Sequence, residues 1–156
     1  MITQIKGKLV EKNPTQLVVD CNGIGYEINI SLHTYSSLSS EENIKLFTHL
    51  QVREDAHILY GFFTVSERAV FRLLISVSGI GTSTARTMLS SLTPAEIQQA
   101  IAIEDVSTIQ GIKGIGSKTA QRVIIELKDK IKNLQGTEEI PVLKSNTIKE
   151  ETLSAL

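Results

Sequence analysis

Residues 79–85 read GIGTSTA and residues 114–120 read GIGSKTA, and this repeated stretch decides the fold of the second half of the chain. The similarity extends outward from both copies at a constant offset of 35 residues. Leu74, Val77 and Leu89 correspond in this way to Ile109, Ile112 and Ile124. Each copy predicts a helix, a tight Gly-Ile-Gly hairpin and a second helix. The glycines let the backbone turn and approach a ligand, and the isoleucine between them is expected to pack into the core.

A hairpin that opens directly into a helix favours anion binding. The first backbone N–H groups of a helix have no partner within it, and the positive end of the helix dipole lies there, so the site suits a phosphate oxygen. Ala85 and Ala120, four residues into each second helix, are small enough for close helix packing. Two such sites side by side would hold both backbones of a DNA duplex across a minor groove without reading bases.

The candidate phosphate contacts are the hairpin glycines and the hydroxyl and cationic residues that follow them. They are Gly79, Gly81, Thr82 and Ser83 in the first copy, and Gly114, Gly116, Ser117, Lys118, Thr119 and Arg122 in the second. The second copy is predicted to bind more strongly, because Lys118 and Arg122 add positive charge. The first copy has no lysine, and Arg86 is its candidate cationic helper.

The pattern resembles the helix-hairpin-helix motif of DNA repair and recombination proteins. One copy alone fits a purely structural helix connection equally well, whereas two copies in register favour DNA binding. A rival interpretation is the phosphate-binding loop Gly-x4-Gly-Lys-Thr of nucleotide hydrolases. Residues 111–119, GIKGIGSKT, miss that pattern by one residue, because Ser117 separates Gly116 from Lys118. Residues 105–110 are also predicted to be helical, whereas a P-loop follows a strand. We therefore expect no ATP hydrolysis, no catalytic residue and no cofactor.

Residues 1–63 predict β structure. Asn22-Gly23 favours a type I′ turn, and the alternation of Tyr26, Ile28 and Ile30 with polar residues predicts a strand with one buried face. Further strands are expected over residues 2–10, 44–52 and 57–63, with a short helical insert over 32–38. Five short strands suggest a small closed barrel, and the OB-fold is the commonest five-stranded form. The fold class is therefore α+β, an N-terminal barrel over residues 1–63 followed by a helical domain over 64–134.

Beyond Leu134 the helical pattern ends. Residues 135–146 are polar, contain Gly136 and Pro141 and show no period, so we expect a flexible linker. Residues 147–156 resemble the start of another helix and are too few to form a domain.

Charge by itself is weak evidence for DNA binding, because the net charge of the chain is -1. Residues 64–133 carry nine Lys and Arg against six Asp and Glu, whereas residues 1–63 carry five against seven. Only the helical region is therefore mildly basic. No membrane-spanning run or secretory signal is visible, and a single cysteine, Cys21, fits a reducing cytoplasm. The three histidines lack the spacing of metal ligands.

The whole chain resembles the RuvA family of bacterial proteins that bind four-way Holliday junctions. The strings that carry the resemblance are IKG at residues 5–7, GIGYE at 23–27, VREDA at 52–56, LYGF at 59–62 and GIGSKTA at 114–120. The resemblance implies a fourfold-symmetric homotetramer that holds the junction open and square-planar while the motor ATPase RuvB pumps DNA arms through it. It also implies RuvC resolvase as a further partner, and it leaves open whether one tetramer or two facing tetramers enclose the DNA.

Glu54 and Asp55 match the acidic pin of that family. Around a junction centre such carboxylates would repel phosphates and discourage strands from pairing again. From the residues alone, charged side chains at a hairpin tip are more simply explained as solvated, and Arg53 beside them is a candidate phosphate contact. Ser83 stands where lysine is common in the family.

Family members also carry a C-terminal helical domain that contacts the motor, so residues 147–156 would be the start of a truncated copy. We therefore expect this form to assemble and to bind junctions without stimulating the motor. A generic barrel-plus-hairpin DNA binder is the alternative function.

Overall fold

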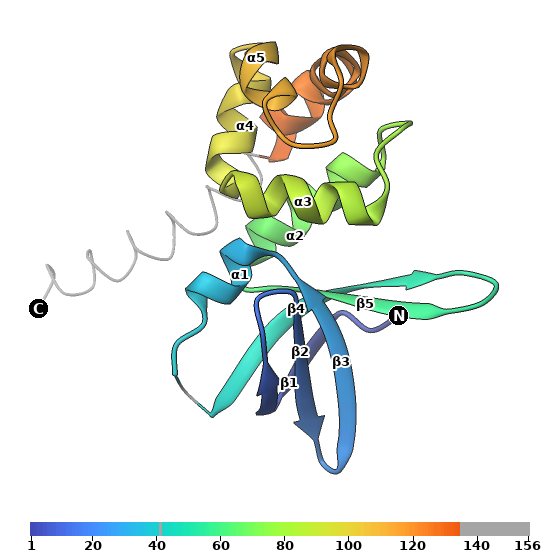
Figure 1. Cartoon of the computed structure of the whole chain (residues 1–156), viewed down its shortest axis with the longest axis vertical. Helices are drawn as coiled ribbons and strands as arrows, with labels where there is room; N and C mark the ends of the chain where they lie inside the picture. Colours follow the sequence, from blue (N-terminus) through green and yellow to red (C-terminus); the bar gives the residue numbers. More distant parts are fainter. Residues whose placement is uncertain (41, 135–156) are drawn as a thin grey trace, which may run out of the picture.

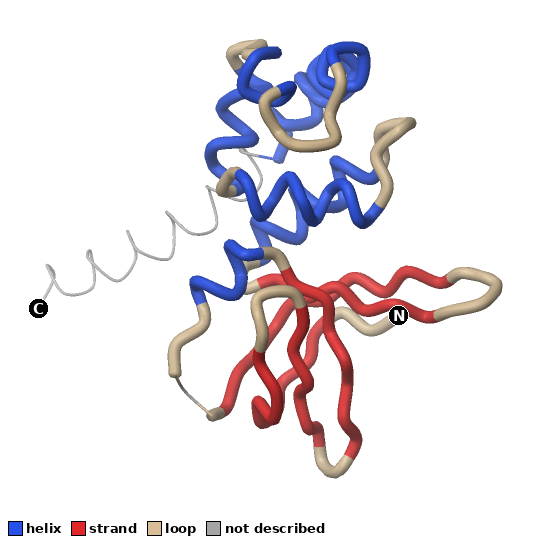
Figure 2. The backbone as a smooth tube through the Cα atoms, in the orientation of Figure 1, coloured by secondary structure: helices blue, strands red, loops and turns tan. Residues whose placement is uncertain are grey.

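The computed structural model describes residues 1–40 and 42–134 of the chain. Figure 1 shows a β-barrel at one end of the molecule and a layer of helices packed on it. Figure 2 shows the strands gathered at one end and the helices, apart from one short helix beside the barrel, at the other. The colours of Figure 1 show that the strands come from the first part of the chain and the other helices from the second. The linker predicted over residues 135–146 and the truncated domain predicted over 147–156 lie outside the described residues.

The barrel contains five strands and one short helix. They are β1 (Gln4–Lys12), β2 (Gln16–Cys21), β3 (Ile24–Ile30), α1 (Leu32–Ser37), β4 (Asn43–Val52) and β5 (His57–Phe62). The sheet closes in the order β1-β2-β3-β5-β4, with β3 and β5 parallel and the other neighbours antiparallel. The expected five-stranded barrel is therefore confirmed. The first strand begins and ends two residues later than the sequence pattern suggested.

Alternation of side chains explains how the barrel forms. Leu17, Val19, Ile28, Ile30 and Leu46 all point inward and are at most 2% exposed. Burial of such side chains stabilises the fold by about 1.5–3 kcal/mol each. The β2–β3 hairpin turns at Asn22 and Gly23, which both have positive φ angles, 55° and 94°. This is the geometry of a type I′ turn, as predicted from the Asn-Gly pair.

The helical layer begins where the hydrophobic period changes, with Thr64 as the N-cap of the first helix. The labelled helices are α2 (Val65–Ile75), α3 (Thr82–Ser91), α4 (Pro94–Ala102) and α5 (Val106–Gln110). A further helix covers residues 117–134. Phe71, Met88, Ile101, Ile109 and Leu127 are fully buried between these helices. The expected helix-hairpin-helix order is therefore present in both copies.

Helix α2 fastens the helical layer to the barrel. Phe71 packs against Tyr60 and Phe62 of β5, with ring centroids 5.2 Å and 4.8 Å apart. The carboxylate of Glu67 is fully buried and accepts hydrogen bonds from the hydroxyls of Ser31 and Thr34. A buried carboxylate needs such donors, because leaving it unpaired would be costly. The first helix-hairpin-helix copy is therefore built onto the barrel through α2.

Within residues 1–40 and 42–134, no helix is long and apolar enough to cross a membrane. In the same part of the chain, no group of three His, Cys, Asp or Glu side chains is arranged to hold a metal ion. Cys21 is a half-buried free thiol that donates to the carbonyl of Lys6.

Candidate nucleic-acid interface

The two Gly-Ile-Gly hairpins have the same backbone hydrogen bonds. In the first, the N–H of Val77 donates to Leu74 O (3.1 Å) and the N–H of Ile80 to Val77 O (3.0 Å). In the second, Ile112 donates to Ile109 O (3.2 Å) and Ile115 to Ile112 O (3.1 Å), 35 residues further on. Ile80 and Ile115 are both buried, as the sequence predicted. The repeat in the sequence is therefore a repeat in structure.

The two glycines of each hairpin have different roles. Gly79 and Gly114 have φ angles of 96° and 89°, a region that residues with a side chain rarely adopt. Gly81 instead is an extended N-cap residue with a φ of -91°. At Gly81 and at Gly116, a Cβ atom would meet nothing within 4 Å. The second glycine therefore leaves an open surface in front of the helix N-terminus.

The helices that follow the hairpins begin without a side-chain cap. Helices α1, α2, α4 and α5 are capped by side chains, from Ser31, Thr64, Thr93 and Asp105. The bonds from Thr108 to Asp105 are strong enough to lower the pKa of that carboxyl. Helix α3 begins at Gly81 with no side-chain cap bond, and the helix over residues 117–134 begins after Gly116, which has no side chain. Both hairpin helices thus lack the cap that the other helices carry, which suits capping by a ligand anion.

The second hairpin presents its polar residues to solvent. Gly114, Gly116, Ser117 and Lys118 are exposed, and Thr119 is half-buried. The hydroxyl of Ser117 and the ammonium of Lys118 follow directly after the N-cap glycine, so they surround the same helix N-terminus. These predicted site residues are therefore brought together in one place.

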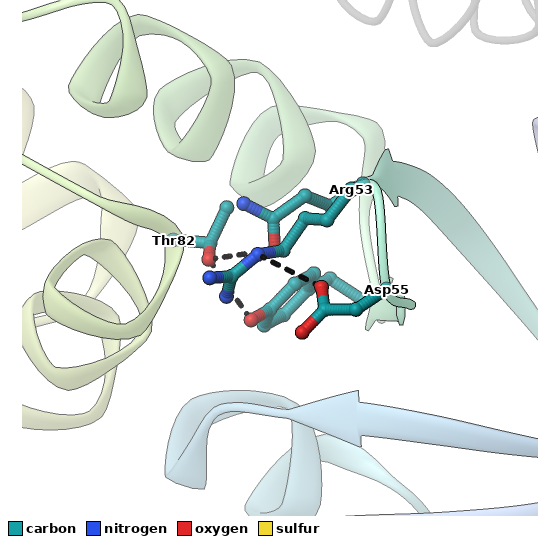
Figure 3. A network of polar contacts seen from close by, with 5 residues as sticks. Arg53, Asp55 and Thr82 are labelled. Atoms are coloured by element: carbon teal, nitrogen blue, oxygen red, sulfur yellow. Dashed lines mark hydrogen bonds and ion pairs between the residues drawn. The ribbon is translucent and has the colours of Figure 1, made fainter. Parts of the chain in front are cut away.

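The first hairpin is arranged differently, although its backbone is the same. Gly79, Gly81 and Ser83 are exposed, but the hydroxyl of Thr82 is turned toward the barrel. It accepts a hydrogen bond from Tyr60 Oη (3.0 Å) and donates one to Gln51 Oε1 (3.1 Å). Figure 3 shows Thr82 within this network of polar contacts. The Thr82 hydroxyl, a predicted phosphate contact, is therefore hydrogen-bonded to other side chains of the protein.

Arg86 also contacts the barrel, and its expected role as a cationic helper of the first hairpin stays a prediction. Its guanidinium donates to Thr15 O (3.4 Å) and to Asn29 Oδ1 (3.2 Å), both on the barrel. Arg86 lies on the side of α3 that faces the barrel, four residues after Thr82, so the same face carries both contacts.

Arg122 connects the two hairpins. Its Nη1 atom donates to the carbonyl of Ser78 (3.3 Å), the residue before the first hairpin glycine. Its Nε atom lies 3.9 Å from a carboxylate oxygen of Glu126, and more than half of the Arg122 side chain is exposed. The guanidinium therefore lies between the two predicted phosphate sites and remains accessible to a ligand.

Glu54 and Asp55 lie at the tip of the hairpin formed by β4 and β5, and both side chains are exposed. Figure 1 shows this hairpin extending outward on the same side of the molecule as the loop between α2 and α3. The turn is closed by a bond from the N–H of Arg53 to Ala56 O (2.8 Å). Arg53 Nε also lies 4.0 Å from Asp55 Oδ1, so a cation lies beside one of the two carboxylates.

The near-match to a P-loop does not have P-loop surroundings. Helix α5 precedes Gly111, as the sequence predicted, whereas the phosphate-binding loop of nucleotide hydrolases follows a strand.

Sequence reasoning missed Gln51 and Tyr60 as partners of the first hairpin. Tyr60 belongs to the string LYGF at residues 59–62 that carries the family resemblance, but no spacing pattern in the sequence links Tyr60 or Gln51 to Thr82.

Comparison with known proteins agrees with this geometry. A family model described as the RuvA N terminal domain matches residues 1–61, and one described as a SAM-like helix-hairpin-helix tandem matches residues 71–129. A Holliday junction branch migration complex subunit RuvA from Christiangramia forsetii is 64% identical over 156 residues, which cover all of this chain and 81% of that protein. The chain belongs to the RuvA family.

Other RuvA proteins support the same assignment. The proteins of the same description from Flavobacterium psychrophilum and Bacteroides thetaiotaomicron are 59% and 53% identical. The first alignment covers all of this chain and 81% of the relative, and the second covers 88% and 68%. The resemblance drawn from the strings at residues 52–56 and 114–120 is therefore confirmed, as is the fold class of a barrel followed by tandem helix-hairpin-helix motifs.

Proposed function

We propose that this chain is the DNA-binding subunit of a branch migration complex and that it binds four-way junctions through backbone phosphates. The observation that carries the proposal is the pair of uncapped helix N-termini behind Gly81 and Gly116, each with open space in front of it. Backbone N–H groups at such a position bind phosphate oxygens and cannot distinguish bases. The relatives are Holliday junction branch migration complex subunits, which supports this proposal.

The two copies would share the phosphate contacts unequally. In the second copy, Gly114, Gly116, Ser117, Lys118 and Thr119 would surround one phosphate with backbone N–H groups, hydroxyls and an ammonium. Arg122 would add a guanidinium between the copies, a group that binds phosphate with two parallel hydrogen bonds. In the first copy, Gly79, Gly81 and Ser83 would rely on backbone N–H groups and one hydroxyl, together with the N–H of Thr82.

The proposed homotetramer is inferred from membership of the RuvA family and not from any contact within one chain. A homotetramer, alone or facing a second one, would place four copies of Glu54 and Asp55 around the crossover and hold the junction open and square-planar. This subunit would do no covalent chemistry. The motor RuvB would supply ATP hydrolysis, and RuvC resolvase would act on the same junction.

A titration of the chain against DNA tests the function. Band shifts with a four-way junction and with linear duplexes of the same sequences should show much tighter binding to the junction. The affinity should fall steeply with salt, because several condensed counterions are released per complex. Equal affinity for junction and duplex would instead favour a generic barrel-plus-hairpin DNA binder.

The acidic pin at Glu54 and Asp55 gives a specific prediction about DNA binding. Replacing Glu54→Gln together with Asp55→Asn removes two negative charges from an exposed tip, so duplex DNA should bind at least as tightly as before. Discrimination between junction and duplex should shrink, and the ratio of the two affinities measures it. Much weaker binding of both DNAs by the double variant would contradict a repulsive role.

A further inference from the structure

The hydroxyl of Thr82 joins two regions that the proposed function uses separately. Thr82 is the first residue of α3 and directly follows Gly81, so it belongs to the first phosphate site. Gln51 lies at the end of β4, two residues before Arg53, and Tyr60 lies on β5, the other strand of the same hairpin. Through the bonds to Thr82, the base of the pin hairpin is fixed to the start of α3 (Figure 3).

These bonds lie where the pin hairpin leaves the body of the protein. Tyr60 is 7% exposed and Gln51 is half-buried, whereas Val52 is 64% exposed and the next three residues are exposed too. A two-stranded hairpin without packing is only marginally ordered by its own ladder. The direction of the tip therefore depends on contacts at the base of the hairpin.

The other end of α3 is held on the barrel independently. Arg86 bonds to Thr15 and Asn29, and the hydroxyl of Ser90 accepts a hydrogen bond from the N–H of Leu32 (3.0 Å). Loss of the Thr82 bonds would therefore leave α3 in place and release the base of the pin.

The equivalent residue in the second copy is used differently. Ser117 occupies the position of Thr82 at the offset of 35 residues, and it is exposed. Figure 1 shows the second hairpin on the part of the helical layer that is farther from the barrel. The same position of the motif thus faces solvent in one copy and the pin hairpin in the other.

We propose that Thr82, Gln51 and Tyr60 are positioning residues that fix the direction of the pin relative to the first phosphate site. They set how well the protein discriminates a junction from continuous duplex, without touching DNA through these side chains. This role rests on the proposed function, because discrimination has meaning only if the chain binds junctions.

The direction of the pin is measured in the absence of DNA. Spin labels are attached to cysteines introduced at Glu54, in the tip, and at Ser91, at the end of α3, in a Cys21→Ser background. The labelled chain is mixed with excess unlabelled chain, so that the distance within one chain is recorded. We expect a narrow distance distribution for the parent and for Thr82→Ser, which keeps the hydroxyl, and a broader one for Gln51→Leu and Thr82→Val. Unchanged widths in Gln51→Leu and Thr82→Val would overturn the proposal whatever the DNA results are.

Binding then tests the consequence. Gln51→Leu should lower the ratio of junction to duplex affinity by about fivefold, the size expected for a lost hydrogen bond, and should leave duplex affinity unchanged. Thr82→Val should lower the same ratio, whereas Thr82→Ser should keep the ratio of the parent. The double variant, Gln51→Leu with Thr82→Val, should have the same ratio as either single variant. Ser117→Ala is the matched control, which should weaken junction and duplex alike. Uniform weakening by Thr82→Val with no effect of Gln51→Leu would make Thr82 a simple phosphate contact. If the parent shows no preference for junctions, the proposed function fails, and the distance measurement still decides the positioning role.

Discussion

The two helix-hairpin-helix copies have the same backbone and different surroundings. In the first copy, α2 and α3 are bonded to the barrel through Glu67, Arg86 and Thr82. In the second copy, Ser117 is exposed at the position equivalent to Thr82, and Lys118 beside it is exposed too. A duplicated motif can therefore keep its backbone geometry while one copy becomes a structural anchor and the other keeps exposed polar side chains.

This difference follows from position in the chain. The first copy directly follows β5, so its helices must bury their apolar faces against the barrel, and polar side chains at the edge of that contact find partners there. The second copy packs on the first, through buried residues such as Ile109 and Leu127. Its hairpin is left facing outward, with Arg122 as the link to Ser78 in the first copy.

The largest expected effect comes from breaking the attachment of the first copy. Glu67→Ala leaves the buried hydroxyls of Ser31 and Thr34 without their acceptor, so the free energy of unfolding should fall by about 3 kcal/mol. Urea unfolding measures this loss. Glu96 is a matched control, because it occupies the same third position of a helix, in α4, but is exposed in a regular capping box. Equal losses from Glu67→Ala and Glu96→Ala would show that the buried network contributes nothing beyond the cap.

The second prediction concerns the lysine that the second helix-hairpin-helix copy carries and the first copy lacks. Lys118→Ala should weaken junction binding about tenfold and reduce the salt dependence by about one counterion, on junctions of unrelated sequence alike. Ser83 is the equivalent position in the first copy, so Ser83→Lys should strengthen binding and partly compensate for Lys118→Ala. Lys132, exposed near the far end of the same helix as Lys118, is the control and should have little effect when replaced by alanine. A loss confined to particular DNA sequences would contradict the phosphate role.

The third prediction breaks the link between the copies. Arg122→Gln removes a charge and the bond to Ser78 O, so junction affinity should fall several-fold, by about 1 kcal/mol. Arg122→Lys should recover only part of the loss, because an ammonium lacks the planar fork of the guanidinium. Glu126→Gln is the control, since it removes the neighbouring carboxylate and leaves Arg122 in place. Binding weakened as much by Glu126→Gln would mean that the ion pair, rather than the bond to Ser78, matters.

The order of elements and the duplicated motif follow from local signals in the sequence. Asn22-Gly23, the alternating strands, the start of the helical region at residue 64 and the offset of 35 residues each reflect short-range geometry, and each is present in the structure. The open surface at Gly81 and Gly116 was predicted for a partly different reason. Both hairpin glycines were expected to allow a tight turn and a close approach to a ligand, whereas a positive φ is found at Gly79 and Gly114 and not at the second glycine of the first hairpin.

The partners of polar side chains were not predictable in the same way. The bond between Thr82 and Gln51 spans 31 residues and that between Ser31 and Glu67 spans 36, and neither has a periodic signature. Such contacts depend on how the barrel and the helices pack. For that reason Arg86 was placed beside the first hairpin, although its guanidinium bonds to the barrel.

The smallest expected effect concerns pH and belongs to the contact between the barrel and the first copy, because all three histidines of the chain precede Thr64 and one of them, His49, packs on α2. His49 of β4 lies against Phe71 of α2, with ring centroids 5.5 Å apart, and its Nδ1 accepts a hydrogen bond from Arg72 Nε (3.3 Å). Burial lowers the pKa of His49 below its ordinary value of 6.5, and the charges of Arg72 and Arg68 lower it further. The unfolded chain therefore takes up a proton near pH 6.5 while the folded chain resists it, so this contribution to stability is complete above pH 6.5 and is lost as the pH falls toward the folded pKa.

Urea unfolding at neutral pH and at about pH 5, below the ordinary pKa of histidine, should reveal this loss. The parent should lose more stability on acidification than His49→Gln, whose side chain does not titrate. His57, exposed at the start of β5, is the matched control, and His57→Gln should lose as much as the parent. If His49→Gln lost stability just as steeply as the parent, carboxylates elsewhere would account for the acid sensitivity, and the contact between β4 and α2 would not respond to pH.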